Sequence, residues 1–195
     1  MIASALRPSA AILAAVLGYL LGSWFDTNLA GMITVAAAGL YGLTVLFSPR
    51  HGIVSTLAHN LQVSLRVIRE DLLAMLYRVE ELGSQRRLAA AEATQAVGGG
   101  LLARWGLSGL VREGRVTRSG EQLDLTPAGR EAARELVRSH RLWETYLHRY
   151  LGLPLDHVHE PAHRAEHFIG PEMRDQLQEK LAAPQTDPHG RDIPE

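Results

Sequence analysis

The chain has 195 residues, with 20 Lys+Arg against 21 Asp+Glu, and this near-zero balance gives no electrostatic argument for nucleic acid as a partner. Cysteine is absent, which excludes disulfides, thiolate metal ligands and a cysteine nucleophile. A metal site in this chain would therefore use histidine and carboxylate ligands.

The first fifty residues have the composition of a membrane segment. Two stretches, Pro8–Phe25 and Leu29–Phe47, carry no charge, and each is about long enough to cross a bilayer as a helix. A cleaved signal peptide and a buried soluble hairpin are the alternatives, but the second apolar stretch follows the first at once. We predict a two-helix transmembrane hairpin over residues 1–50.

Charged residues around these stretches indicate an orientation. Positive residues precede and follow the pair, whereas the connecting turn contains Asp26. This pattern predicts both termini on the cytoplasmic side of the cell membrane. The positive flanks are Arg7, Arg50, His51, Arg66 and Arg69. The glycines expected to allow close helix packing in lipid are Gly18, Gly22, Gly31, Gly39 and Gly42.

The exit from the second stretch reads Leu46-Phe47-Ser48-Pro49-Arg50-His51-Gly52. With the spans before it, this segment resembles the last two transmembrane helices of manganese/zinc/iron ABC transporter permeases, over about residues 5–55. The resemblance implies a membrane location and other ABC transporter subunits as partners. Two spans without an internal charge are not a transport pathway by themselves.

The remaining residues predict a mainly α-helical structure. The order of three helices followed by a strand hairpin is typical of a winged helix. Thr126 before Pro127 predicts the start of a long helix. The expected helices are 52–69, 70–82, 85–97, 101–110, 127–151, 161–168 and 171–182, and the expected strands are 110–116 and 122–126.

Histidines and carboxylates gather between residues 139 and 167. His140 and Glu144 are four residues apart on the long helix, and His163 and His167 are another such pair, with Glu166 beside them. His159 is expected in the connection between the helices. Imidazole and carboxylate ligands suit manganese, iron, cobalt or zinc. The alternatives are a solvated histidine-rich surface and, from His-Arg-Ala-Glu-His, an inverted zinc peptidase motif that lacks a downstream partner.

Two segments carry a second resemblance. Residues 130–167, which include Ser-His-Arg-Leu-Trp-Glu, and the trailing Thr-Asp-Pro-His-Gly are similar to the metal-binding and dimerisation domain of the diphtheria-toxin-repressor/manganese-transport-regulator (iron-dependent repressor) family. Glu70-Asp71-Leu72-Leu73 with Tyr77 resembles the family's first helix, so the resemblance covers about residues 70–194.

The second resemblance implies two metal sites and a homodimer. The primary site would consist of Asp71, His163, Glu166 and His167, and the ancillary site of His140, Glu144 and His159. Mn²⁺ is the expected ion, with Fe²⁺ or Zn²⁺ as alternatives. His163 departs from the family, whose manganese type has Glu there and whose iron type has Cys; Ala74 lacks a carboxylate that manganese types carry. The dimer seam is expected at Leu142, Tyr146, Tyr150 and Leu153.

The stretch expected to contact DNA bases has few side chains that can form hydrogen bonds with base edges. Residues 98–110 hold five glycines, one Arg and one Ser. Glycine weakens a helix, and apolar side chains cannot read base edges by hydrogen bonds. Arginines could still contact phosphates. These are Arg104, Arg112, Arg115 and Arg118.

These observations predict a non-enzymatic metal-responsive regulator attached to the membrane. The expected parts are a transmembrane hairpin (1–50), a juxtamembrane helix or linker (51–69), a winged helix (70–129), a metal-binding and dimerisation domain (130–183) and an extended tail (184–195). The expected function is transcriptional regulation in transition-metal homeostasis, with a DNA operator as partner. The alternative is the cytoplasmic metal-sensing part of a manganese/zinc/iron ABC transporter permease that does not bind DNA.

Overall fold

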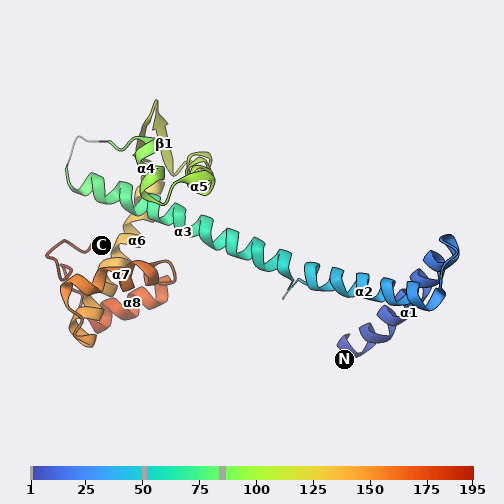
Figure 1. Cartoon of the computed structure of the whole chain (residues 1–195). Helices are drawn as coiled ribbons and strands as arrows, with labels where there is room; N and C mark the ends of the chain where they lie inside the picture. The colour runs from blue at the N-terminus through green and yellow to red at the C-terminus, as the bar shows by residue number, and fades with distance from the viewer. Residues whose placement is uncertain (1, 50–51, 84–86) are drawn as a thin grey trace. The chain divides into compact units, whose positions relative to one another are not determined.

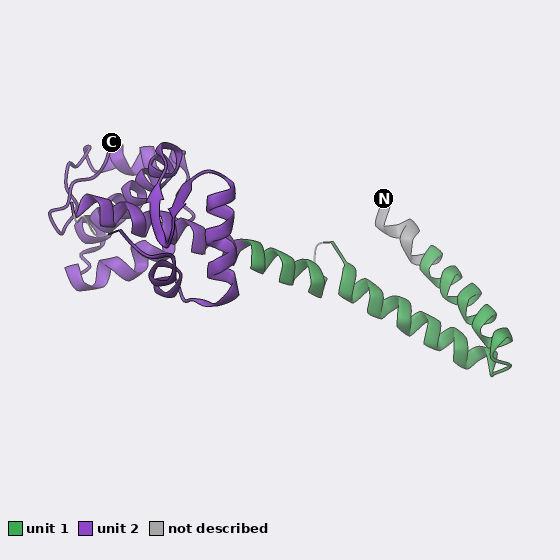
Figure 2. Ribbon diagram, turned by 90° about the horizontal axis from the view of Figure 1, so that it is seen from above, with its two compact units in different colours: residues 1–62 green, residues 63–195 purple. Residues whose placement is uncertain are grey.

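The computed structural model describes residues 2–49, 52–83 and 87–195, with side chains from Ser9 onward (Figure 1). The chain forms two compact units, residues 1–62 and 63–195 (Figure 2). Arg7, Arg50 and His51, three of the predicted positive flanks, lie outside the described side chains. Each unit is described by itself below.

The elements follow one another mostly as helices. In chain order they are α1 (Ile2–Trp24), α2 (Leu29–Phe47), α3 (Ile53–Glu81), α4 (Ala90–Ala96), α5 (Gly100–Arg112), β1 (Val116–Ser119), β2 (Gln122–Leu125), α6 (Pro127–Leu151), α7 (Leu155–Glu166) and α8 (Pro171–Lys180). The expected mainly α-helical class is confirmed.

The N-terminal unit contains the predicted helical hairpin. The Asn28 side chain caps α2 by accepting hydrogen bonds from the backbone N–H groups of Ala30 and Gly31 at 3.0 and 3.2 Å. The two helices approach closely at Gly18, where an added Cβ would lie 2.3 Å from Ile33 Cα. Glycine is therefore needed at that crossing.

Two of the five expected packing glycines serve that purpose. Gly18 and Gly22 face α2, whereas Gly31, Gly39 and Gly42 have no atom within 4 Å of an added Cβ. Close packing of those three against other helices in lipid stays a prediction. They lie on a face of α2 that α1 does not cover, so glycine content alone did not reveal which face is packed.

Within the described residues, α2 is the helix whose length and composition suffice to cross a membrane, with a mean hydropathy of 1.8. Most of its residues are exposed, although Ala36 is buried and Ile33 contacts α1 at Gly18. The apolar part of α1, Ser9–Trp24, is shorter.

Helix α3 is longer than predicted because two expected helices are one. Residues 52–69 and 70–82 join into a single α-helix that ends before Gly83, whose φ is +61°. Its apolar residues Leu72, Leu73 and Leu76 are buried with Leu110 of α5 and Val116 of β1 in one core cluster. This core holds the winged-helix part of the second unit together.

The strand hairpin pairs Val116 with Leu125 and Ser119 with Gln122. The expected first strand, 110–116, is wrong: residues 110–112 finish α5, and β1 begins at Val116. The reason is that Ala103, Leu107 and Leu110 are spaced as one buried helical face, so the helical period extends past residue 110. Of the expected helix 85–97, residues 85 and 86 lie outside the described residues, and the described helix begins at Ala90 because Ala89 is extended and pairs with Gln122.

The glycines of α5 have a packing role. An added Cβ at Gly106 would lie 3.0 Å from Ile68 Cγ2, and one at Gly109 would lie 3.8 Å from the Arg69 side chain. Both positions are buried against α3. The glycines therefore lie on the inner face of α5, and its outward face consists of other residues.

The long helix α6 starts and ends as predicted. The Thr126 hydroxyl accepts a hydrogen bond from Gly129 N at 3.1 Å, and Pro127 occupies the first turn. Gly152, with a φ of +66°, provides the left-handed C-terminal cap. The expected helix 127–151 is confirmed.

Gly129 permits the closest contact between α6 and the loop before the hairpin. A Cβ at this position would lie 1.9 Å from the carbonyl oxygen of Arg115, which itself accepts a hydrogen bond from Thr126 N. We expect Gly129→Ala to lower the free energy of unfolding by about 1–3 kcal/mol, as overpacking does. Denaturant unfolding of the detergent-solubilised chain measures this. Gly170→Ala, where no atom lies within 4 Å, is the control and should cost nothing; equal midpoints for the two variants would contradict the prediction.

Helix α7 begins earlier than expected. The sequence predicts a helix over residues 161–168, but the helix starts at Leu155 and Pro161 lies inside it. His159 is therefore on α7, and its expected place in a connecting loop is wrong. The tail from residue 184 has no helix and forms an isolated bridge between Thr186 and Asp192.

The expected dimer seam is partly unsuitable. Leu142 is 1% exposed and packs with Leu177, Leu181 and Ile193 inside the protomer, so it is unavailable to a second chain. Tyr150, by contrast, is exposed.

Candidate metal centre

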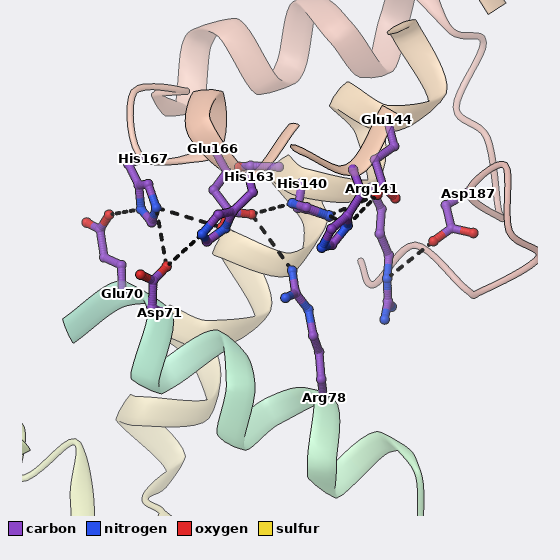
Figure 3. Close-up of polar contacts among 12 residues, drawn as sticks. Glu70, Asp71, Arg78, His140, Arg141, Glu144, His163, Glu166, His167 and Asp187 are labelled. Carbon is purple, nitrogen blue, oxygen red and sulfur yellow. Dashed lines mark hydrogen bonds and ion pairs between the residues drawn. The ribbon is translucent and has the colours of Figure 1, made fainter. Parts of the chain in front are cut away.

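Four predicted ligands meet between α3 and the end of α7 (Figure 3). We call Asp71, His163, Glu166 and His167 the first cluster; one ligand atom from each lies within 4.8 Å of every other. Asp71 comes from α3, whereas His163 and Glu166 are one helical turn apart on α7 and His167 is its C-cap. Helical periodicity brings the last three together, and packing of α3 adds the fourth.

Distances within the first cluster are those of a site for a small cation. His167 Nε2 lies 3.3 Å from Asp71 Oδ1 and 3.9 Å from Glu166 Oε1. His163 Nδ1 lies 2.9 Å from Glu166 Oε1. Glu166 and His167 are buried, at 3% and 7% exposure.

Three side-chain atoms of the first cluster are buried without a hydrogen-bond partner: Asp71 Oδ1, Glu166 Oε2 and His167 Nε2. Such atoms are costly in a folded protein unless something satisfies them. Asp71 Oδ1 and His167 Nε2 face one another at 3.3 Å, and both are atom types that bind divalent metals. The residues present therefore fit a divalent transition metal.

A carboxylate outside the first cluster orients His167. His167 Nδ1 lies 2.8 Å from Glu70 Oε2, and Arg66 donates to the other Glu70 oxygen at 2.9 Å and to the His167 carbonyl at 3.1 Å. With Nδ1–H donating to Glu70, the Nε2 lone pair is left to face the first cluster. This role of Glu70 was not predicted from the sequence, in which the one signal for it is the position of Glu70 next to Asp71.

Glu70→Gln is expected to weaken metal binding by about 10–100-fold, the usual cost of losing a carboxylate that orients a ligating histidine. The reason is that a side-chain amide can offer N–H to Nδ1 and so favour the wrong tautomer. Metal titration by calorimetry measures the change. Glu80→Gln is the control, since Glu80 lies on the same helix and pairs with Arg130 at the surface. A loss of the same size in both variants would count against this role.

The other predicted ligands form a second cluster, His140, Glu144 and His159. Glu144 Oε1 lies 3.0 Å from His140 Nε2 and 3.0 Å from His159 Nδ1, and the two ring nitrogens are 3.1 Å apart. His140 and Glu144 are buried, whereas the His159 side chain is 63% exposed. The second cluster is therefore buried at His140 and Glu144 and open to solvent at His159.

Glu166 lies between the two clusters. Its Oε1 contacts His163, and its Oε2 lies 2.6 Å from His140 Nδ1. The Arg78 guanidinium approaches the same Oε2 at 3.8 Å. One carboxylate thus contacts ligands of both clusters (Figure 3).

The pKa values of these groups are shifted so that the charged forms of both the histidines and the carboxylates are favoured. Burial alone would lower the pKa of His167, but the Asp71 and Glu70 carboxylates outweigh it and raise the pKa to about 9. Burial alone would raise the pKa of Glu144, but His140 and His159 lower it to about 2. Burial alone would also lower the pKa of His140, but Glu144 and Glu166 outweigh this effect and raise the pKa. Protons on the imidazoles thus hold the carboxylates together when no metal is bound.

A buried arginine joins three segments beside the second cluster. Arg141 is 3% exposed, and its guanidinium donates to both carboxylate oxygens of Glu81, at 2.9 and 2.5 Å. It also donates to the carbonyl oxygen of Asp192 at 2.5 Å and lies 3.8 Å from Asp187 Oδ2. Arg141 could not be predicted as a buried residue, because nothing local in the sequence distinguishes it from a solvated charge.

Three of the four arginines expected to contact DNA surround one groove. A pocket of about 650 Å³ between α4, α5 and β1 is lined by Arg104, Arg112 and Arg118, but not by Arg115. Arg115 instead lies 3.8 Å from Glu113. The outward face of α5 also exposes Leu101 at 68% and Trp105 at 58%.

Comparison with known proteins agrees with this geometry. Residues 126–195 match the family described as iron dependent repressor, metal binding and dimerisation domain. Over 129 residues the chain is 34% identical to the diphtheria toxin repressor of Corynebacterium diphtheriae, which covers 64% of this chain and 55% of the relative. A solved manganese-dependent transcriptional repressor in complex with manganese has a TM-score of 0.60 and 32% identity, covering 65% of this chain and 58% of that one.

A different relative extends into the N-terminal unit. A probable metal transport system membrane protein of Chlamydia pneumoniae is 34% identical over 170 residues, covering 84% of this chain and 38% of the relative. The second unit has 133 residues (63–195), so the match includes residues of the first. The chain spans about a third to a half of the length of these two curated relatives. The two resemblances predicted from the sequence are confirmed, as is a winged helix followed by a dimerisation domain.

Proposed function

Because residues 126–195 match the metal-binding and dimerisation domain of iron dependent repressors, we propose that this chain is a membrane-attached, metal-responsive regulator in transition-metal homeostasis. The observation that carries the proposal is the first cluster, in which an α3 carboxylate of the winged-helix part meets three ligands of α7 within 4.8 Å. The predicted role of the first cluster as the primary metal site remains part of this proposal.

The ligands come from two parts of the second unit, and this division supports a regulatory role. Asp71 lies on the helix whose buried side forms the winged-helix core, whereas Glu166 and His167 belong to α7 and its cap. A bound divalent ion would supply the positive charge that holds Asp71 to Glu166 and His167. It would therefore favour the docked arrangement by differential affinity. His167 would first give up its proton, which the Glu70 and Asp71 carboxylates retain in the metal-free chain.

The donor set includes two carboxylates and two imidazoles. Carboxylates suit Mn²⁺, the expected ion, whereas the imidazoles of His163 and His167 also suit Fe²⁺ and Zn²⁺. Ala74 lines the small pocket beside the first cluster together with Asp71, His163 and Glu166, so no further carboxylate is offered from that turn of α3.

The membrane attachment is proposed from α2 and from the chlamydial relative. α2 is apolar and largely exposed, and the relative is named as a membrane protein of a metal transport system. Both termini on the cytoplasmic side, as the positive-inside rule predicts, would expose the second unit to cytoplasmic metal and DNA.

DNA binding is proposed on the arginine-lined groove. Arg104, Arg112 and Arg118 would contact phosphates, which position a protein on the duplex, and Arg115 would add a further contact beside them. Ser108 offers one hydroxyl on the outward face of α5. A homodimer, as in the family that residues 126–195 match, would present two such faces to an operator.

A second function, sensing metal for an ABC transporter without binding DNA, is favoured by one specific observation. Leu101 and Trp105 are largely exposed on the helix that would enter the major groove. Such side chains are typical of protein contacts and do not read base edges by hydrogen bonds. In this case the same metal site would regulate a permease subunit.

One experiment separates the two functions. The full chain in lipid nanodiscs is mixed with fragmented genomic DNA, with Mn²⁺, with Zn²⁺ or with a chelator, and the retained fragments are sequenced. Metal-dependent retention of a specific site, lost in Asp71→Ala, supports the regulator. Metal binding by calorimetry without specific retention supports the transport sensor. Absence of metal binding in the unaltered chain would reject both.

A further inference from the structure

We propose that a small monovalent oxyanion, a carboxylate or bicarbonate, binds in the small pocket beside the first cluster, between a bound metal and Arg78. This inference rests on the proposed metal-binding function. It gives a role to a pocket and an arginine that are outside the ligand sets of both clusters. It is based on the residues that line the pocket, the position of the Arg78 guanidinium and the charge balance of the site.

The small pocket has a volume of about 170 Å³ and adjoins the first cluster directly. Its wall includes three ligands of that cluster, Asp71, His163 and Glu166. Ala74 and Arg78 of α3 form another part of the wall, and apolar side chains complete it. A water molecule takes about 30 Å³ in the liquid. The small pocket therefore has room for an anion of three or four heavy atoms.

The Arg78 guanidinium has a donor available for such an anion. Its Nη2 atom is buried and has no hydrogen-bond partner among the described residues. The ion pair described for Arg78 is with Glu166, whose Oε2 lies 3.8 Å from Nη2, beyond hydrogen-bond distance (Figure 3). The neighbouring Arg141, by contrast, donates to both carboxylate oxygens of Glu81. A guanidinium with free N–H groups is the side chain best suited to bind a planar oxyanion.

The first cluster by itself leaves ligand positions open for an octahedral ion. It provides four ligand atoms, whereas Mn²⁺ favours six ligands that are mostly oxygen. Asp71 supplies one oxygen from α3, but Ala74, one turn further along the helix, supplies none. An oxyanion in the small pocket would provide oxygen on the side where Ala74 stands.

Metal binding changes the charge balance in favour of an anion. The carboxylates of Asp71 and Glu166 carry two negative charges, which a divalent ion neutralises. Glu166 is also the described partner of Arg78, so the metal takes over the carboxylate that the guanidinium faces. Glu70 does not replace it, because Glu70 pairs with Arg66. One positive charge, that of Arg78, is then left beside the small pocket, and a monovalent oxyanion balances it.

The test is a titration of the full chain, in nanodiscs of zwitterionic lipid, with Mn²⁺, whose free concentration is read from its EPR signal. His159→Ala serves as the background, because it removes an exposed ligand of the second cluster and leaves the first intact. Sodium acetate or sodium bicarbonate should raise Mn²⁺ affinity about tenfold over sodium chloride at equal ionic strength, within the 5–150-fold range usual for coupled ligands. The larger of the two factors identifies the source as organic or inorganic. By reciprocity, saturating Mn²⁺ should raise the affinity for the anion by the same factor.

Two substitutions locate the anion. Arg78→Gln should abolish the ratio between acetate and chloride, whereas the matched control Arg130→Gln, at a surface arginine that pairs with Glu80, should keep it. Arg78 also borders the larger opening at the second cluster, so a second variant tests the small pocket itself. Ala74→Glu places a carboxylate in the small pocket, and Mn²⁺ affinity in chloride should then rise and no longer respond to acetate.

The failure of this inference is distinguishable from that of the proposed function. Equal Mn²⁺ affinity in acetate, bicarbonate and chloride, or an acetate effect that survives Arg78→Gln, would overturn the anion site and leave the proposed function standing. An acetate effect that persists in a folded Ala74→Glu chain would reject the small pocket as its place. If the unaltered chain binds no Mn²⁺ in any of these buffers and no Zn²⁺, the proposed function fails as well.

Discussion

Replacing Glu166 with alanine is expected to remove metal binding at the first cluster and to weaken it at the second. Glu166 Oε1 belongs to the first cluster, and its Oε2 lies 2.6 Å from His140 Nδ1. Loss of an acceptor that orients a ligating histidine costs about 10–100-fold in affinity, and loss of a ligand costs more. We therefore expect more than 100-fold at the first cluster and about tenfold at the second.

The measurement is a metal titration that resolves two binding events. Glu166→Gln keeps the shape and serves to separate charge from packing. Truncation to alanine also leaves the Arg78 guanidinium without its carboxylate and His140 with Glu144 alone, at a cost of about 3–5 kcal/mol in stability. Glu160→Ala is the control on α7, where Glu160 is 74% exposed and pairs with Arg164. If Glu166→Ala weakened one event and left the other untouched, a shared role for this carboxylate would be excluded.

Metal affinity at the first cluster is expected to rise with pH up to about 9. The neighbouring carboxylates raise the pKa of His167 to about 9, so the residue is protonated at neutral pH in the metal-free chain. Binding at Nε2 must displace that proton, and each pH step below this pKa should raise affinity by roughly tenfold per proton released. Calorimetry in buffers of different ionisation enthalpy counts the protons. Affinity that is flat between pH 6.5 and 9 would contradict this expectation.

The metal-free chain should show the opposite trend in stability. A pKa of about 9 for His167 in the folded chain, against 6.5 as its ordinary value, means that the folded form holds the proton more tightly. The stabilisation is complete below pH 6.5 and is lost as the pH rises towards 9, with an upper bound of about 3 kcal/mol. For Glu144, whose pKa falls to about 2 from 4.5, stabilisation is present above pH 4.5 and is lost towards pH 2. Denaturant unfolding with a chelator present checks both limits, and His157→Ala should show the same profile as the unaltered chain.

Much of the second unit could be predicted because its signals are local. Thr126 and Gly152 set the ends of α6, and an i,i+4 spacing places His140 above Glu144 on one face of that helix. Three ligands of the first cluster could be placed near one another in the same way, since one turn of α7 joins them. Asp71 was reached by resemblance alone, because no local pattern relates α3 to α7.

The rest depended on packing that the sequence does not display. The glycines of α5 suggested a weak helix, but they are the residues that let α5 approach α3 at Ile68 and Arg69. A helix was expected from residue 161, and the true start at Leu155 places His159 on that helix. Glu70 acts on a ligand that is remote in sequence, so its part in the first cluster became visible only in three dimensions.

Arg141 couples the presence of the C-terminal tail to the identity of the residue at position 141. Its buried guanidinium is shared by Glu81 at the end of α3 and by the tail, through Asp187 and the Asp192 carbonyl. A gene truncated before residue 187 would leave that cation half-matched in the interior, and such a cation is tolerated only with partners. Descendants that discard the tail should therefore also replace the arginine with a neutral residue, and the two changes should be inherited together.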